Sequence, residues 1–171
     1  RLNGVKIGEN FSVRGLPYIN VTRKGNLVIG KNFSANSGYN FNIIGRQQKL
    51  IFWVNGTLTI KNNVRISSSA LICHHKITIK DNVVIGGNTV IYDTDFHSLN
   101  SKLRIDRESD LSDAKFSEVI INENVFIGAH CTILKGVCIG KNSIIGACSV
   151  VTKNIPPNQI WAGNPAKFIK K

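Results

Sequence analysis

The chain has 171 residues and a net charge of +12 at pH 7, from 22 lysine and arginine residues against 10 aspartate and glutamate residues. This length suits one domain with its own core, and the 15 glycines with only 4 prolines exclude a low-complexity chain. The longest purely apolar run, residues 50–54, is far too short to span a bilayer, and no signal peptide is visible. Since the sequence begins at Arg1 and contains no methionine, we expect the natural protein to have residues before it.

Cysteine spacing and charge indicate the compartment and the kind of partner. The four cysteines form no Cys-x-x-Cys pair, which favours free thiols and a cytoplasmic location over a disulfide framework. The positive charge favours an anionic partner. We expect no nucleic acid, because the basic residues are spread along the chain without a helix-turn-helix or a base-stacking motif. A phosphorylated small molecule, an acidic saccharide or simply a solvated basic surface accounts for the charge.

One pattern recurs along the whole chain: an aliphatic residue, a spacer, isoleucine, two mostly polar or glycine residues, then asparagine. Asparagine adopts a positive φ at low cost, so each copy predicts a short strand that ends at a corner. Irregular spacing between Ile29 and Ile60 predicts a loop of about 13 residues near residues 42–50. The copies are residues 5–10, 27–32, 58–63, 77–82, 119–124 and 137–142.

From Ile121 onward the chain reads in groups of six until the Pro156-Pro157 pair. A β-branched aliphatic residue begins each hexad, and three residues later stands mostly asparagine or glycine, at Asn124, Gly136, Asn142 and Asn154. Neither an α-helix nor an ordinary hairpin sheet has this period. The pattern predicts an all-β fold, a parallel β-helix of hexapeptide repeats over residues 1–155, and a basic C-terminal tail over residues 156–171. We expect a left-handed coil, against the usual crossover rule, because short strands with little twist can close that way.

The hexads also predict which side chains stack inside the coil, and where the coil is interrupted. The hexads stop after Phe96 and resume at Ile121, so a charged loop over residues 97–120 should leave the coil at one corner. Long loops on a rigid scaffold are often functional. The predicted inner columns are Ile60, Ile79, Ile121 and Ile139; Ile66, Ile85, Ile127 and Ile145; and Ile72, Ile91, Ile133 and Val151.

Several motifs resemble the hexapeptide-repeat acyltransferases, in particular the maltose and galactoside O-acetyltransferase-like enzymes, which include enzymes that acetylate bacterial surface saccharides. The motifs are residues 127–129, 133–137, 145–153 and 162–167, with Asp93-Thr-Asp95-Phe-His97 before the loop. The resemblance is strong over residues 60–167 and generic before them. It implies an acetyl-CoA-dependent O-acetyltransferase acting on a sugar or saccharide precursor. It also implies a homotrimer with active sites between neighbouring prisms.

His97 is the candidate general base, because a neutral imidazole suits removal of a hydroxyl proton. Its place at the loop exit lets the ring face a cleft. Asp95 falls at a position that normally points inward, so it, or Asp93, can orient His97 or instead bond the corner backbone. The register places His74 and His75 near the same cleft, where they can contact the acceptor. The other acceptor-side candidates are Ser67, Asn88 and Asp93.

The donor site is expected on the C-terminal coils. Ala129 and Ala147 occupy the same place in hexads 18 residues apart, so they stack on one edge and leave the backbone accessible. In the family such positions line the pantetheine arm, and the resemblance implies the same role here. It also places Thr152, Lys153 and Lys167 at the coenzyme A phosphates, where lysine acts as a flexible point charge.

Three alternatives remain open at the level of sequence. A non-catalytic β-helical scaffold or sugar-binding subunit would keep the coil and lose the chemistry. Acetylation of an amino-sugar nitrogen is closer to the main interpretation. The γ-class carbonic anhydrases share the fold and bind zinc through histidines, but this chain lacks their His-x4-His pair, and adjacent histidines point apart on a strand. We therefore expect no metal.

Overall fold

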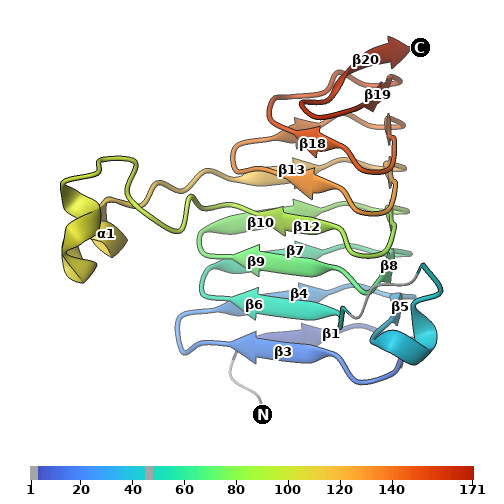
Figure 1. Ribbon diagram of the computed structural model, residues 1–171. Helices are drawn as coiled ribbons and strands as arrows, with labels where there is room; N and C mark the ends of the chain where they lie inside the picture. Colours follow the sequence, from blue (N-terminus) through green and yellow to red (C-terminus); the bar gives the residue numbers. More distant parts are fainter. Residues whose placement is uncertain (1–3, 45–47) are drawn as a thin grey trace.

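The computed structural model describes residues 4–44 and 48–171, which form a rod of short strands with one segment extended to the side (Figure 1). Successive strands belong to three different sheets, so each set of three makes one coil. All neighbouring strands in the coils pair in parallel. The predicted parallel β-helix is confirmed.

The first sheet contains β1 (Val5–Ile7), β4 (Asn26–Ile29), β7 (Thr57–Ile60), β10 (Lys76–Ile79), β13 (Val119–Ile121) and β16 (Cys138–Ile139). The second contains β2 (Ser12–Arg14), β5 (Ser34–Asn36), β8 (Arg65–Ser67), β11 (Val84–Ile85), β14 (Phe126–Ile127), β17 (Ile144–Ile145), β19 (Ile160–Ala162) and β20 (Lys167–Lys170). The third contains β3 (Tyr18–Val21), β6 (Ile51–Val54), β9 (Ala70–Cys73), β12 (Val90–Tyr92), β15 (Thr132–Ile133) and β18 (Val150–Val151).

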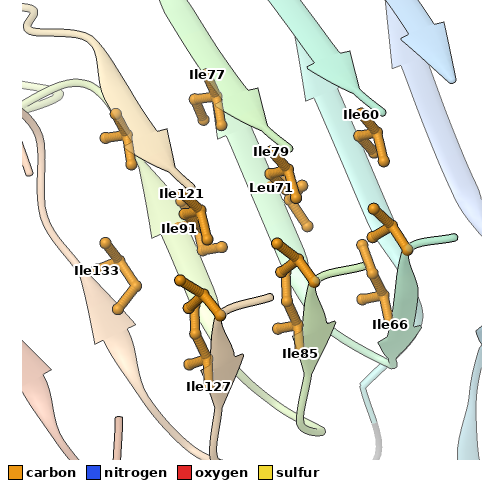
Figure 2. Close-up of a cluster of buried hydrophobic side chains, with 14 of the residues drawn as sticks. Ile60, Ile66, Leu71, Ile77, Ile79, Ile85, Ile91, Ile121, Ile127 and Ile133 are labelled. Carbon is orange, nitrogen blue, oxygen red and sulfur yellow. The ribbon is translucent and has the colours of Figure 1, made fainter. Parts of the chain in front are cut away.

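Aliphatic side chains fill the inside of the coil, and the three predicted columns are part of this core (Figure 2). The first two columns are confirmed, since their residues pair across adjacent strands as predicted. The third was wrong in one place, because Leu71 rather than Ile72 pairs with Ile91. The corner before Leu71 is one residue shorter than elsewhere: Ser68, two residues after Ile66, has the positive φ of 40°. That shortening brings Leu71 into the core, where it is fully buried.

A ladder of asparagines follows one corner of the rod. Each has a positive φ, and each amide donates to the side-chain oxygen of the next asparagine at 2.8–3.0 Å. Asn154 does not join the ladder; it accepts from the backbone N–H of Cys138 at 2.8 Å, and Asn158 takes the corner position. The ladder consists of Asn10, Asn32, Asn63, Asn82, Asn124, Asn142 and Asn158.

Alanine at Asn82 should destabilise the protein more than glycine at the same position. Both changes remove the side-chain bonds to Asn63 and Asn124. Only alanine also keeps a Cβ in the left-handed region, where Asn82 has φ 61°, at a cost of about 1–2 kcal/mol. Thermal unfolding of the two variants, side by side, measures the difference. An alanine variant as stable as the glycine variant would contradict this role of the corner.

The coil continues beyond residue 155, where the tail was predicted to begin. Pro156 and Pro157 occupy only a corner, and β19 then pairs in parallel with β17. β20 folds back antiparallel on β19, with the Trp161 and Phe168 rings 6.4 Å apart. The C-terminal segment therefore closes the end of the rod.

The extended segment leaves after β12 and returns to β13. Its stem is a short antiparallel pairing of Thr94 with Phe116, so it begins slightly earlier than the predicted residues 97–120. The segment contains two short helices that repeat analysis does not predict, η2 (Leu103–Ile105) and α1 (Arg107–Asp113). Asp106 caps α1 by accepting from the backbone N–H of Ser109 at 2.8 Å.

A second, smaller loop connects β5 and β6, where the irregular spacing predicted one. It contains η1 (Tyr39–Phe41), and residues 45–47 of the prediction lie outside the described residues. Within the described ranges, none of the helices has the length and apolar character needed to cross a bilayer.

Candidate active site

His97 lies at the base of the extended segment and has one carboxylate partner. Its Nδ1 is 2.7 Å from Oδ2 of Asp110 in α1. The Asp110 side chain is only 11% exposed, whereas that of His97 is 67% exposed. The hydrogen bond from His97 lowers the pKa of Asp110, and the smaller contribution of the Ser98 backbone N–H acts in the same direction. Both favour the ionised carboxylate. In the tautomer that donates Nδ1–H to this carboxylate, Nε2 of the neutral ring carries the lone pair, and no hydrogen bond joins it to another described residue.

The segment around this pair is tied together by further hydrogen bonds. The second oxygen of Asp110 accepts from the backbone N–H of Ser98 at 2.8 Å. The Ser98 hydroxyl donates to Asp113 at 2.6 Å, and the Arg104 guanidinium donates to the Ser98 carbonyl at 2.8 Å. Ser98, which bonds the carboxylate that orients His97, is therefore itself held by Asp113 and Arg104.

Neither of the aspartates predicted to orient His97 is bonded to it. Asp95 lies 3.4 Å from the ammonium of Lys135 and helps to form the loop stem through its backbone. Asp93 is fully buried, and its two oxygens accept from the backbone N–H groups of His74 and His75, both at 2.8 Å. Asp93 thus bonds the corner backbone, the alternative left open above, and its burial excludes contact with an acceptor. Asp110 was missed because it lies in a helix without hexad periodicity.

His74 and His75 follow β9, beside the base of the extended segment. His74 packs between Phe96 and Phe116, with ring centroids 5.9 and 6.1 Å away, and its Nε2 is 3.4 Å from the Asn55 amide. His75 is exposed. His74 lines an apolar groove of about 590 Å³ that runs towards the N-terminal coils over the third sheet. The other lining residues are Tyr18, Ile51, Trp53, Asn55, Ile72 and Phe96.

The structure separates the remaining acceptor-side candidates from this groove. Ser67 lies on the outer face of the second sheet, in a different pocket of about 380 Å³. Asn88 is only 7% exposed at a corner with φ 58°, and its Oδ1 accepts from Asn42 at 3.0 Å. Burial gives Asn88 a structural role in the single chain.

The donor candidates lie along one corner of the C-terminal coils. Ala129 and Ala147 stand on consecutive coils, and Cys148 N–H donates to the Ala129 carbonyl at 2.9 Å, so the two corners stack as predicted. A Cβ on Gly128 would approach the Ala147 nitrogen to 2.6 Å, which shows how closely the backbones stack. A side chain at Gly128 would therefore collide with the backbone of the next coil.

The basic donor candidates lie at the C-terminal end of the rod. Thr152 and Lys153 follow β18 and are exposed. The Lys153 ammonium lies 5.4 Å from the centroid of the Trp161 ring in β19. Lys167 begins β20, which pairs with β19, and is also exposed. The two lysines therefore extend from neighbouring parts of the last coil.

The described residues contain no group of three or more histidine, cysteine, aspartate or glutamate side chains placed to hold a metal ion. The four cysteines are free. His97 and Asp110 form a titratable pair at the loop base, with Nδ1 and Oδ2 2.7 Å apart.

Comparison with known proteins gives the same class of protein as the fold, namely hexapeptide-repeat proteins. Residues 118–153 match the family described as bacterial transferase hexapeptide (six repeats). The chain is 33% identical over 166 residues to galactoside O-acetyltransferase of Escherichia coli (strain K12), covering 96% of this chain and 63% of that protein. It thus spans less than two thirds of the length of that relative.

Two solved structures are similar over nearly the whole chain. A galactoside acetyltransferase in complex with coenzyme A is 30% identical with a TM-score of 0.65, covering 99% of this chain and 66% of that one. A maltose O-acetyltransferase from Clostridium difficile 630 is 30% identical with a TM-score of 0.60, covering 96% and 67%. The chain belongs to the family of hexapeptide-repeat acetyltransferases.

Proposed function

We propose that this protein is an acetyl-CoA-dependent O-acetyltransferase that acts on a sugar or saccharide precursor, with His97 as the general base. The observation that carries the proposal is the His97–Asp110 pair at the loop base, with Nε2 of His97 free. An imidazole fixed by a carboxylate on one nitrogen, and open on the other, suits proton transfer from a bound hydroxyl. The family relationship supports acetyl-CoA as the donor.

The proposed reaction is a transfer of the acetyl group from sulfur to oxygen. Nε2 of His97 removes the acceptor hydroxyl proton as that oxygen attacks the thioester carbonyl carbon. The new carbon–oxygen bond gives a tetrahedral intermediate, and the carbon–sulfur bond then breaks. The departing sulfur takes the proton back from the imidazolium, which leaves His97 neutral and releases coenzyme A. Asp110 stabilises the transient imidazolium.

Changing Asp110 to asparagine should lower kcat by at least about tenfold and leave the affinity for coenzyme A unchanged. An amide orients the ring less firmly than a carboxylate and does not stabilise the imidazolium. Asp113→Asn is the matched control, since Asp113 bonds Ser98 and not His97. Steady-state rates of both variants give the comparison. Equal losses in the two would mean that Asp110 only supports the loop.

Coenzyme A is proposed to lie along the corner formed by Ala129 and Ala147. The small side chains there let an extended pantetheine arm approach the corner backbone. Lys153 and Lys167 extend from the last coil, where they can meet the phosphates, with Thr152 beside them. The coenzyme A held by the similar galactoside acetyltransferase supports a donor of this kind.

The active assembly is proposed to be a homotrimer with sites between neighbouring prisms. In a single chain His97 is open to solvent. The apolar side chains of Leu99, Ile105 and Leu111 on the extended segment are also 76%, 88% and 53% exposed. A neighbouring prism can cover both, and cyclic association about a three-fold axis closes such contacts. The free thiols and the acetyl-CoA donor favour the cytoplasm as the compartment.

A thiol-release assay with acetyl-CoA and a panel of saccharides tests the proposal, since free coenzyme A reports turnover with any acceptor. We expect release that depends on the acceptor. Coenzyme A titration accompanies the assay: a protein that binds neither coenzyme A nor acetyl-CoA would be the scaffold alternative instead.

A further inference from the structure

The outer face of the second sheet carries a polar pocket of about 380 Å³ at the N-terminal half of the rod. Its sides are formed by outward residues of β2, β5 and β8, while Val13, Ala35 and Ile66 between them point inward. Val84 and Ile85 of the next strand, β11, complete the lining. Two of the lining residues are arginines and none is acidic. The outward polar residues are Ser12, Arg14, Ser34, Asn36, Arg65 and Ser67.

Strand register fixes how these six side chains are arranged. Ser12, Ser34 and Arg65 form one row across the three strands, and Arg14, Asn36 and Ser67 form the next. The two arginines therefore begin at diagonally opposite corners, two strand spacings or about 9.6 Å apart across the sheet. Long arginine side chains from opposite corners can both reach a group held over the middle strand, where Ser34 and Asn36 add donors.

None of these six side chains has a hydrogen bond or ion pair to another residue within the described ranges 4–44 and 48–171. Elsewhere on the rod lysines are paired with carboxylates, such as Lys31 with Glu9 and Lys80 with Glu123. Two unpaired guanidinium groups over serine and asparagine side chains form the donor set that binds a carboxylate or a phosphate. The lining has no aromatic residue, so it offers no surface on which a nucleic-acid base can stack.

We infer that this pocket binds the carboxylate or phosphate group of an acidic saccharide, through Arg14 and Arg65. The hydroxyl and amide side chains beside the arginines suit the sugar hydroxyl groups. That this saccharide is the acceptor rests on the proposed acetyl transfer, whereas the binding itself does not. The inference assigns a binding role to two of the basic residues that contribute to the chain's net charge of +12.

Calorimetric titration with two matched pairs of probes tests the inference. The first pair is a trigalacturonic acid and its neutral methyl ester, and the second is galactose 6-phosphate and galactose. We expect the charged member of at least one pair to bind at least about tenfold more tightly than its neutral match, with an affinity that falls as salt is added. The pair with the larger difference identifies carboxylate or phosphate as the natural group.

Arg65→Gln and Arg14→Gln should each remove most of that difference, while Arg23→Gln, an exposed arginine outside the pocket, should keep it. Circular dichroism shows whether each variant keeps the fold. Equal affinity for charged and neutral probes, or charged-probe binding unchanged in both pocket variants, would overturn the inference. The titrations need no turnover, so a negative result would remove only the pocket and leave the proposed acetyl transfer, which the thiol-release assay tests, standing.

Discussion

Replacing His97 with asparagine should lower the rate of acetyl transfer by about 10²–10⁴, because general-base catalysis contributes roughly that factor. Asparagine keeps a polar side chain of similar reach but cannot take a proton at neutral pH. The exposed position of His97 means that the fold does not depend on the ring. Single-turnover measurement with saturating acetyl-CoA isolates the chemical step from binding.

The same variant should bind coenzyme A as the wild type does, because the proposed donor corner is formed by residues 129–153 and the last coil. Calorimetric titration of coenzyme A checks this. Unchanged turnover in a folded His97→Asn protein would remove His97 as the base. Equal loss of turnover and of coenzyme A affinity would instead assign the ring to donor binding.

Replacing Ala147 with phenylalanine should lower the affinity for coenzyme A by at least about tenfold, equivalent to 1.4 kcal/mol or more. Ala147 is exposed at a corner, so a large side chain there extends into the proposed pantetheine path and not into the core. The rod should stay folded, because the inward neighbours Ile145 and Ser149 are untouched and fully buried. Titration with coenzyme A is the measurement.

Ala147→Ser is the matched control, since it changes polarity and leaves the edge narrow. It should bind coenzyme A within a few-fold of the wild type. A phenylalanine variant that is folded and retains full affinity would place the donor on another face of the rod.

The regular part of the fold follows closely from the sequence. Aliphatic residues that recur every six positions predict stacking inside the coil, because equivalent residues of successive coils lie in the same column. Ile79, Ile121 and Ile139 form one such column. Asparagine at the corner after the first sheet marks a positive φ, and the ladder of side-chain bonds adds a second reason for that residue type. Both signals are local and repeat many times, so one irregular coil does not hide them.

The departures from prediction arise where a corner breaks the period. Three consecutive serines at residues 67–69 shorten one corner, which moved Leu71 into the place predicted for Ile72. Pro156-Pro157 suggested an end, yet proline is compatible with a corner that needs no backbone donor, and Trp161 continues the core. Spacing alone does not distinguish a tight corner from a missing residue, or a proline corner from a terminus.

The candidate site divides in a similar way. His97 was predicted because a motif precedes a break in the repeat, and the structure places it at the loop base with a carboxylate. Asp110 lies 13 residues further along in a helix of its own. One signal was present in the sequence: Asp106 followed by Glu108 and Asp110 is typical of a capped helix start. Asp110 meets His97 only because the loop folds back on itself, and the repeat pattern of the sequence does not predict that fold.

The central claim is tested most directly by the product of a reaction between acetyl-CoA and a saccharide. Mass spectrometry of the saccharide after incubation, with and without mild alkali, shows whether an acetyl group is gained and whether it is held as an ester. We predict an alkali-labile acetyl group with the wild-type protein, formed about 10²–10⁴ times more slowly with His97→Asn. An alkali-stable acetyl group would mean transfer to nitrogen, and a saccharide that gains no acetyl group from a protein that binds coenzyme A would contradict the proposed transfer.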